Sequence, residues 1–169
     1  RLFSRHLTAL ADGLSYDDPS PNTFSFNSPY GACPACNGLG VRREIDPDLV
    51  VPNPKKTIRQ GALAPLGTPR DVWVFSQLGA VAEVYGFDYD TPFEDLTDAH
   101  KAVILDGAGD EQFDIVYSYK GRKVTYQHRY SGVYGHVQHT LDNASSKAQR
   151  TWGEAFMRLR ACKVCDGGR

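Results

Sequence analysis

The sequence is poor in sulfur, with four cysteines and one methionine among its 169 residues. So few cysteines in a chain of this length exclude the disulfide-dense scaffold of small secreted domains. No apolar run approaches the roughly 20 residues of a membrane-spanning helix, and the first residues do not resemble a signal peptide. We therefore expect a globular, cytoplasmic protein.

The sequence also lacks the motifs that cradle nucleotide phosphates. Neither G-x-x-x-x-G-K-[ST] nor G-x-G-x-x-G occurs in it. His136 and His139 have a suggestive i, i+3 spacing, but no carboxylate completes a catalytic pattern with them, so we interpret the histidines as surface or packing residues. These absences predict that the chain has no catalytic residues and is not itself an enzyme.

Charge is unevenly distributed along the chain, although the net charge is only −1. Residues 44–114 contain 14 acidic and five basic side chains, whereas residues 120–169 contain ten basic and three acidic ones. A basic segment interleaved with tyrosines is typical of proteins that bind a phosphate backbone. The alternative is that the basic residues face the acidic half within the same molecule. The sequence leaves both interpretations open.

The four cysteines form two C-x-x-C pairs, each followed by glycines. Two such pairs supply the four thiolates of a tetrahedral Zn²⁺ site, and glycine lets the chain turn tightly around the metal. We predict one structural Zn²⁺ ion with residues 37–161 inserted between the two halves of its site. Its ligands would be Cys33, Cys36, Cys162 and Cys165.

Three other uses of the cysteines remain open at this point. A thioredoxin-like redox pair is expected to open a helix after a buried strand, and neither pair follows a strand-like run. Two separate disulfides would suit a smaller, secreted chain. Each pair could also bind metal together with ligands outside this chain.

Hydrophobic periodicity predicts an α+β fold, a small mixed lobe with a β-hairpin and several helices, anchored on a Cys₄ zinc module. Residues 69–85 are predicted to form a helix, and a shorter one begins at Thr97 and ends before Gly107. Residues 112–119 and 122–129 read as a β-hairpin. A last helix, capped by Ser145 or Ser146, is predicted to run into the second cysteine pair; its apolar stripe is Trp152, Ala155, Phe156 and Leu159.

The rest of the chain is predicted to be rich in turns. Pro47, Pro52 and Pro54 favour a loop over residues 46–57. Short strands are predicted around residues 23–26 and 40–45. Near the N-terminus, Phe24 and Phe26 are expected to anchor an otherwise extended segment.

Several segments resemble the UvrA family of excinuclease ABC proteins, the DNA-damage-sensing ABC-type ATPases of bacterial nucleotide excision repair. The matching segments are FSFNSPYGACPACNGLG at residues 24–40, EIDPDLVVPNP at 44–54, YGFDYDTPFEDL at 85–96 and CKVCDGGR at 162–169. Many relatives carry a further C-x-x-C upstream of the first segment, where this sequence has residues 9–12, ALAD. That departure favours one zinc ion over two.

The resemblance implies an internal fragment whose two cysteine pairs clasp the base of an insertion domain that can swing near DNA. Residues 1–43 would belong to the zinc module and signature domain, 44–150 to the insertion domain, and 151–169 to the returning helix and second cysteine pair. The P-loop, signature and Walker B motifs of the family lie outside the matched stretch. ATP, UvrB and a second copy of UvrA would therefore be bound by the full-length protein.

The predicted function is recognition of damaged double-stranded DNA through backbone phosphates, which carry no sequence information. A lesion sensor can use such contacts because it reads shape and deformability. The predicted DNA-binding residues are Lys120, Arg122, Lys123 and Arg129 on the hairpin with Lys147 and Arg150, and Arg158 and Arg160 could extend the surface. Alternatively, the lobe docks a repair partner or the other copy of UvrA through an acidic turn, formed by Asp88, Asp90, Glu94, Asp95 and Asp98.

Overall fold

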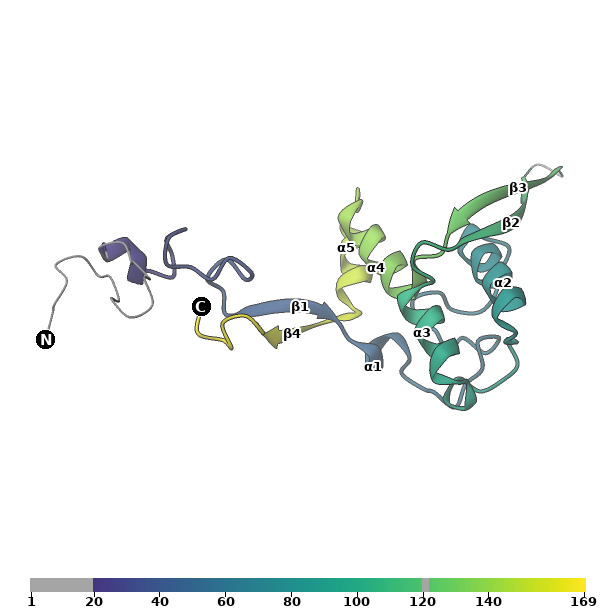
Figure 1. Cartoon of the computed structure of the whole chain (residues 1–169). Helices are drawn as coiled ribbons and strands as arrows, with labels where there is room; N and C mark the ends of the chain where they lie inside the picture. The colour runs from purple at the N-terminus through teal and green to yellow at the C-terminus, as the bar shows by residue number, and fades with distance from the viewer. Residues whose placement is uncertain (1–19, 120–121) are drawn as a thin grey trace, which may run out of the picture. The chain divides into compact units, whose positions relative to one another are not determined.

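The computed structural model describes residues 20–119 and 122–169, and of residues 117–119, 122 and 123 it describes the backbone alone. The chain divides into two compact units. The described part of the first comprises residues 20–44 and 159–169, and the second is Ile45–Arg158 (Figure 1). The fold is α+β, as predicted. Among the helices of the described residues, none combines the length and the apolar character that crossing a membrane requires.

Two paired strands carry the chain from the first unit into the second and back. β1 (Val41–Ile45) confirms the strand predicted around residues 40–45, and its partner is β4 (Met157–Ala161). At one end of the ladder the Asp46 N–H donates to the Phe156 carbonyl at 2.9 Å, and at the other the Cys162 N–H donates to the Gly40 carbonyl at 2.9 Å. Residue numbers increase along β1 in the direction in which they decrease along β4, so the two strands are antiparallel (Figure 1).

β4 occupies part of the region predicted as the last helix, so that prediction is wrong beyond residue 154. The helix there, α5 (Lys147–Glu154), begins with the predicted cap at Ser146, which forms a capping box with Gln149. It ends before Leu159, whose side chain is 64% exposed in β4. Residues 157–161, MRLRA, alternate apolar and charged side chains, and this period of two fits a strand better than a helix.

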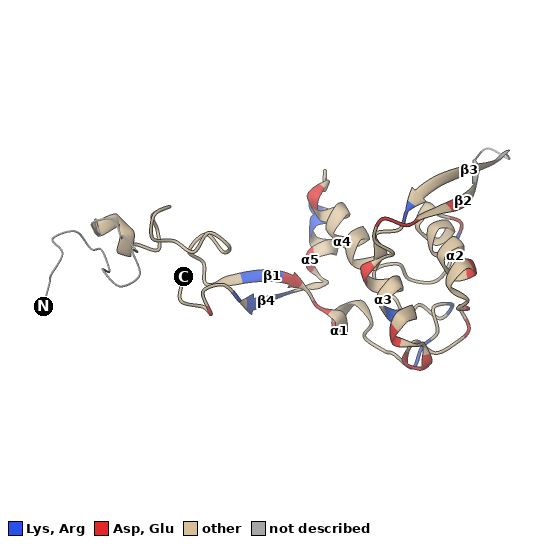
Figure 2. Cartoon of the chain, in the orientation of Figure 1, with Lys and Arg blue, Asp and Glu red and all other residues tan. Residues whose placement is uncertain are grey.

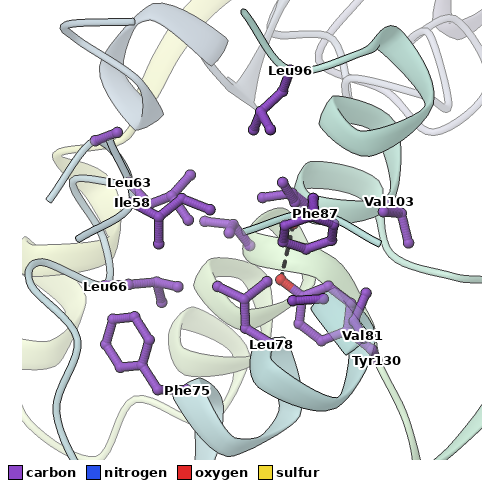
Figure 3. Close-up of a cluster of buried hydrophobic side chains, with 14 of the residues drawn as sticks. Ile58, Leu63, Leu66, Phe75, Leu78, Val81, Phe87, Leu96, Val103 and Tyr130 are labelled. Carbon is purple, nitrogen blue, oxygen red and sulfur yellow. Dashed lines mark hydrogen bonds between the residues drawn. The ribbon is translucent and has the colours of Figure 1, made fainter. Parts of the chain in front are cut away.

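A cluster of buried apolar side chains holds the second unit together. Helix α2 (Trp73–Tyr85) contributes Leu78 and Val81, helix α3 (Asp98–Asp106) contributes Ile104, and strand β2 (Gln112–Tyr119) contributes Ile115, all fully buried. Figure 3 shows Leu78, Val81 and Tyr130 packed side by side in this cluster. The Tyr130 hydroxyl donates to the Ile104 carbonyl at 3.0 Å, so the buried phenol has its hydrogen-bond partner.

The elements around this core largely follow the predictions. α2 starts at residue 73 rather than 69 because Val72 is still extended, and it ends at Gly86, whose φ of 75° is left-handed. The Thr97 hydroxyl accepts from the His100 N–H at 3.2 Å and caps α3. The predicted hairpin is confirmed as β2 (Gln112–Tyr119) paired antiparallel with β3 (Arg122–Arg129).

Four features differ from the predictions. Helix α4 (Gly132–Asp142) was missed, since two glycines weaken its helical pattern. A single helical turn, α1 (Pro47–Val50), opens the predicted loop and is capped by the Asp46 side chain. Residues 21–24 form a 3₁₀ turn, η1 (Pro21–Phe24), rather than a strand; η2 (Phe93–Asp95) is a second such turn. Phe24 and Phe26 are 75% and 52% exposed, so within the described residues neither is a buried anchor, although the Arg169 guanidinium carbon lies 5.2 Å from the centre of the Phe26 ring.

Candidate metal centre

The four cysteines meet at one point of the first unit. The Sγ atoms of Cys33 and Cys162 lie 3.9 Å apart, those of Cys36 and Cys165 lie 3.8 Å apart, and all four lie within 4.8 Å of one another. All four are free thiols. A tetrahedral ion with Zn–S bonds of about 2.3 Å separates its sulfur ligands by about 3.8 Å. The four sulfurs are therefore spaced to share one metal ion.

The first cysteine pair is shaped by the turns that follow it. The Gly38 N–H donates to the Cys33 carbonyl at 3.3 Å, and the Gly40 N–H donates to the Cys36 sulfur at 3.2 Å. Gly38 has a φ of 75°, and a Cβ there would collide with the Phe26 carbonyl oxygen. Glycine is needed at this position because the chain must both turn left-handed and pass close to another backbone segment. The N–H donated to sulfur is of the kind that stabilises a metal-bound thiolate.

The second pair follows β4 directly, which corrects the expectation that neither pair follows a strand. No helix begins at this pair, where the chain continues as turns, so the arrangement is not that of a thioredoxin-like motif. Backbone N–H groups of Cys165 and Val164 lower the pKa of the Cys162 thiol to about 7. Burial raises the pKa of the Cys165 thiol to about 11. A metal ion that took all four sulfurs would therefore displace a proton from Cys165 near neutral pH.

The cysteines also form the apolar core of the first unit. Its buried apolar side chains, within the described residues, are Cys33, Cys36 and Cys162, with Ala35 and Cys165 packed against them. The larger apolar side chains of this unit are exposed instead; they include Phe24, Phe26, Tyr30, Leu39 and Val164. The apolar core formed by the described residues of this unit is too small to hold them by hydrophobic burial alone. A bound ion would supply the missing stability, and it also fits the spacing of the sulfurs.

The structure describes the side chains of some of the predicted DNA-binding residues but not of others. Lys120 lies outside the described residues, and for Arg122 and Lys123 only the backbone at the start of β3 is described. Arg129, the last residue of β3, forms an ion pair with Asp110, in which the Arg129 Nη1 and Asp110 Oδ1 atoms lie 2.7 Å apart. Lys147 and Arg150 are exposed on α5, where Figure 2 shows basic residues along the helix.

Several basic residues are paired with the acidic half of the sequence, as one of the two interpretations of the charge pattern predicted. Besides Arg129, Arg158 lies 3.3 Å from the fully buried Asp46 carboxylate, and Lys163 lies 3.7 Å from Glu44. The sequence could not supply these partners, because each pair joins residues far apart along the chain. For these three residues the intramolecular interpretation is confirmed.

The acidic turn is also partly used within the fold. One Asp88 oxygen accepts from the Asp90 and Thr91 N–H groups, both at 2.7 Å, and these hydrogen bonds lower the pKa of the Asp88 carboxyl. The Arg59 guanidinium donates two hydrogen bonds, of 2.6 and 3.1 Å, to the Asp90 carboxylate. These hydrogen bonds lower the pKa of the Asp90 carboxyl. Asp88 and Asp90 thus fix the loop, which leaves less free charge for a docking partner.

Comparison with known proteins identifies the second unit. A family model described as the UvrA DNA-binding domain matches residues 46–155, which lie within that unit. The chain belongs to the UvrA family. The predicted family membership is confirmed.

Comparison with individual proteins extends this similarity to all 169 residues of the chain. Over its full length the chain is 43% identical to UvrABC system protein A from Methanothermobacter thermautotrophicus, and the match covers 18% of that protein. It is also 41% identical to the Thermus thermophilus protein of the same name, in a match that covers 99% of this chain and 18% of the relative. It also resembles the crystal structure of UvrA2 from Deinococcus radiodurans, with a TM-score of 0.66 and 28% identity over 88% of this chain and 19% of that one. The chain thus spans less than a fifth of each of these proteins.

Proposed function

We propose that this chain is the zinc-holding, DNA-binding segment of a UvrA-type damage-recognition protein of nucleotide excision repair. The match of residues 46–155 to the UvrA DNA-binding domain carries the proposal. The substrate is damaged double-stranded DNA, bound through its backbone phosphates. ATP hydrolysis and assembly with UvrB and a second copy of UvrA belong to the longer protein, of which the chain is one part.

Zinc is the metal that best suits the four cysteines. Four cysteine sulfurs that all lie within 4.8 Å of one another, two pairs of them at 3.8 and 3.9 Å, favour a tetrahedral ion that binds thiolate ligands. Four thiolates fill the coordination sphere of Zn²⁺ and leave no position for a substrate, so the bound ion is structural. Its role is to hold together two short segments that are separated by more than a hundred residues of sequence.

The first turn of α5 supplies the clearest cationic surface for phosphate. Lys147 and Arg150 are three residues apart on the helix, so their side chains share one face. Cations near a helix N-terminus oppose the helix dipole and cost a few tenths of a kcal/mol. Because this placement does not stabilise the helix, we attribute it to an external anion, and a DNA phosphate is the anion that a UvrA-type segment would meet.

Arg129 can join these contacts despite its ion pair. The Arg129 and Asp110 side chains are 59% and 91% exposed. An exposed pair of this kind contributes at most about 1 kcal/mol. The guanidinium can therefore exchange Asp110 for a phosphate, and it would add a third cation to those of α5 and to the hairpin residues Lys120, Arg122 and Lys123.

Charge reversal on α5 tests the phosphate contacts. We expect the double change K147E and R150E to weaken binding of a fluorescein-labelled duplex roughly tenfold at 100 mM salt. It should also reduce the slope of log K against log salt by about 2, because two phosphate contacts are lost. Fluorescence anisotropy over a salt series measures both quantities.

A matched control carries the same charge change elsewhere in the second unit. Lys55 and Lys56 are exposed in the loop after α1, so K55E with K56E alters the net charge equally. We expect this control to leave the salt slope within experimental error of the unmodified chain. Equal losses in the two double variants would show that α5 makes no specific contact and that only net charge matters.

A further inference from the structure

Two neighbouring hollows in the second unit share one histidine. The first has a volume of about 230 Å³ and is lined by Trp73, Gln77 and His136, among others. The second has a volume of about 340 Å³ and is lined by His136, Arg70 and Trp152, among others. His136 lies on α4 and forms part of the wall of both. We call the surface formed by Arg70, Trp73, His136 and Trp152 the tryptophan surface.

The two tryptophans of the chain each line one of these hollows. Trp73 is contacted edge-on by His128, with ring centroids 5.6 Å apart. Trp152 is contacted edge-on by His136 at 6.0 Å and by Phe156 at 5.3 Å. Edge-to-face neighbours from other elements hold both indoles in place. Both rings are thus positioned before any ligand arrives.

The histidine between them is an aromatic wall rather than a cation at neutral pH. Burial, and then the neighbouring His139, lower the pKa of His136 below its usual value. A metal role for the imidazoles is not supported, because the residues that the structure describes contain one metal-binding group, the four cysteines. The lining is accordingly aromatic and hydrogen-bonding, with one cation, Arg70, at the second hollow.

The sizes of the hollows select a small ring as the ligand. The first is below, and the second near, the lower end of the roughly 300–1,000 Å³ range of pockets for drug-sized molecules. Bases of unpaired nucleotides stack on aromatic side chains. The Gln77 amide nitrogen already contacts His128 and the Arg129 carbonyl, so its amide oxygen is the group that can accept a hydrogen bond from a base edge. The bases of an intact duplex are stacked inside the helix and cannot enter, so such a site takes bases only where pairing is lost.

We propose that the tryptophan surface binds unpaired nucleotides, with one base against Trp73, a second against Trp152 on the other side of His136, and Arg70 on a phosphate. The inference rests on the proposed function, because it assumes that DNA reaches the second unit. It adds a preference that phosphate contacts alone cannot give. Damage that unpairs or extrudes bases would be bound more tightly than an intact duplex.

Intrinsic fluorescence provides a direct test, because the full 169-residue chain contains two tryptophans and each lies at one hollow. The zinc-loaded chain is titrated with oligothymidine, with a duplex carrying a three-nucleotide bubble, and with the same duplex fully paired. Stacking on indole quenches its emission, so oligothymidine and the bubble duplex should quench, whereas the paired duplex should not. W73F and W152F, which keep an aromatic ring in each place, should each remove part of the quenching.

Arg70 gives a second readout that does not depend on either indole. We expect R70Q to weaken oligothymidine binding several-fold by anisotropy and to leave paired-duplex binding unchanged. K55Q is the matched control, because it removes one exposed positive charge from the same unit, and it should affect neither ligand.

The outcomes separate this inference from the proposed function. If anisotropy shows that the paired duplex binds while oligothymidine and the bubble duplex cause no quenching, the tryptophan surface is not a nucleotide site and the proposed function stands. Equal quenching by paired and unpaired DNA also overturns the inference. If none of the three DNAs binds, both the inference and the proposed function fail.

Discussion

The double change C162A and C165A is expected to abolish metal binding and unfold the first unit while leaving the second unit folded. Three of the four cysteines are the buried apolar side chains of the first unit's described part, so losing the ion leaves that part almost no core. The second unit has its own cluster, which includes the fully buried Leu78, Val81 and Ile104. Metal-dependent folding of this kind is usual for small Cys₄ modules, since metal binding supplies most of their folding energy.

Two measurements test the loss of the metal and the unfolding of each unit separately. Native mass spectrometry should find one zinc ion on the unmodified chain and none on the double variant. Hydrogen exchange should show fast exchange in residues 31–44 and 159–169 of the variant and unchanged protection in α2 and α3. K163A is the control, because it alters an exposed residue between the two cysteines and removes only the Glu44 ion pair. A double variant that kept its zinc, or that lost protection throughout α2, would contradict this account.

Leu78→Ala is expected to destabilise the second unit by about 3 kcal/mol. The Leu78 side chain is fully buried on α2. Replacing such a side chain with alanine removes apolar contacts and leaves a cavity, which together cost about 2–5 kcal/mol. Alanine is an excellent helix former, so the loss reflects packing rather than helix propensity.

Urea unfolding monitored by tryptophan fluorescence measures this change, since both tryptophans lie in the second unit. Val84→Ala is the matched control on the same helix, because the Val84 side chain is 61% exposed. We expect the control to change the free energy of unfolding by less than about 0.5 kcal/mol. If both variants lost the same stability, the buried face of α2 would have been assigned wrongly.

The elements with strong local signals could be predicted from the sequence. The hairpin has two β-branched and aromatic segments separated in the sequence by Lys120 and Gly121, and α3 lies between a capping Thr97 and Gly107. The last helix was extended too far, because Leu159 fits the helical stripe as well as it fits the alternation of β4. The partner that decides between them, β1, lies more than a hundred residues earlier in the sequence.

The candidate site was predictable in its ligands but not in its surroundings. The spacing of the two C-x-x-C pairs was enough to predict that Cys33, Cys36, Cys162 and Cys165 come together. The carboxylates that neutralise Arg129 and Arg158 could not be predicted, because they are brought close only by tertiary folding. The two hollows beside His136 were missed for the same reason, as their walls come from α2, β3, α4, α5 and the loop before α2.

X-ray absorption at the zinc edge of the purified chain tests the central claim most directly. A site made by both cysteine pairs predicts four sulfur neighbours at about 2.3 Å and no nitrogen or oxygen ligand. Two sulfurs together with nitrogen or oxygen would show that the two pairs do not share an ion. Such a result would contradict the assignment of the first unit as one Cys₄ module.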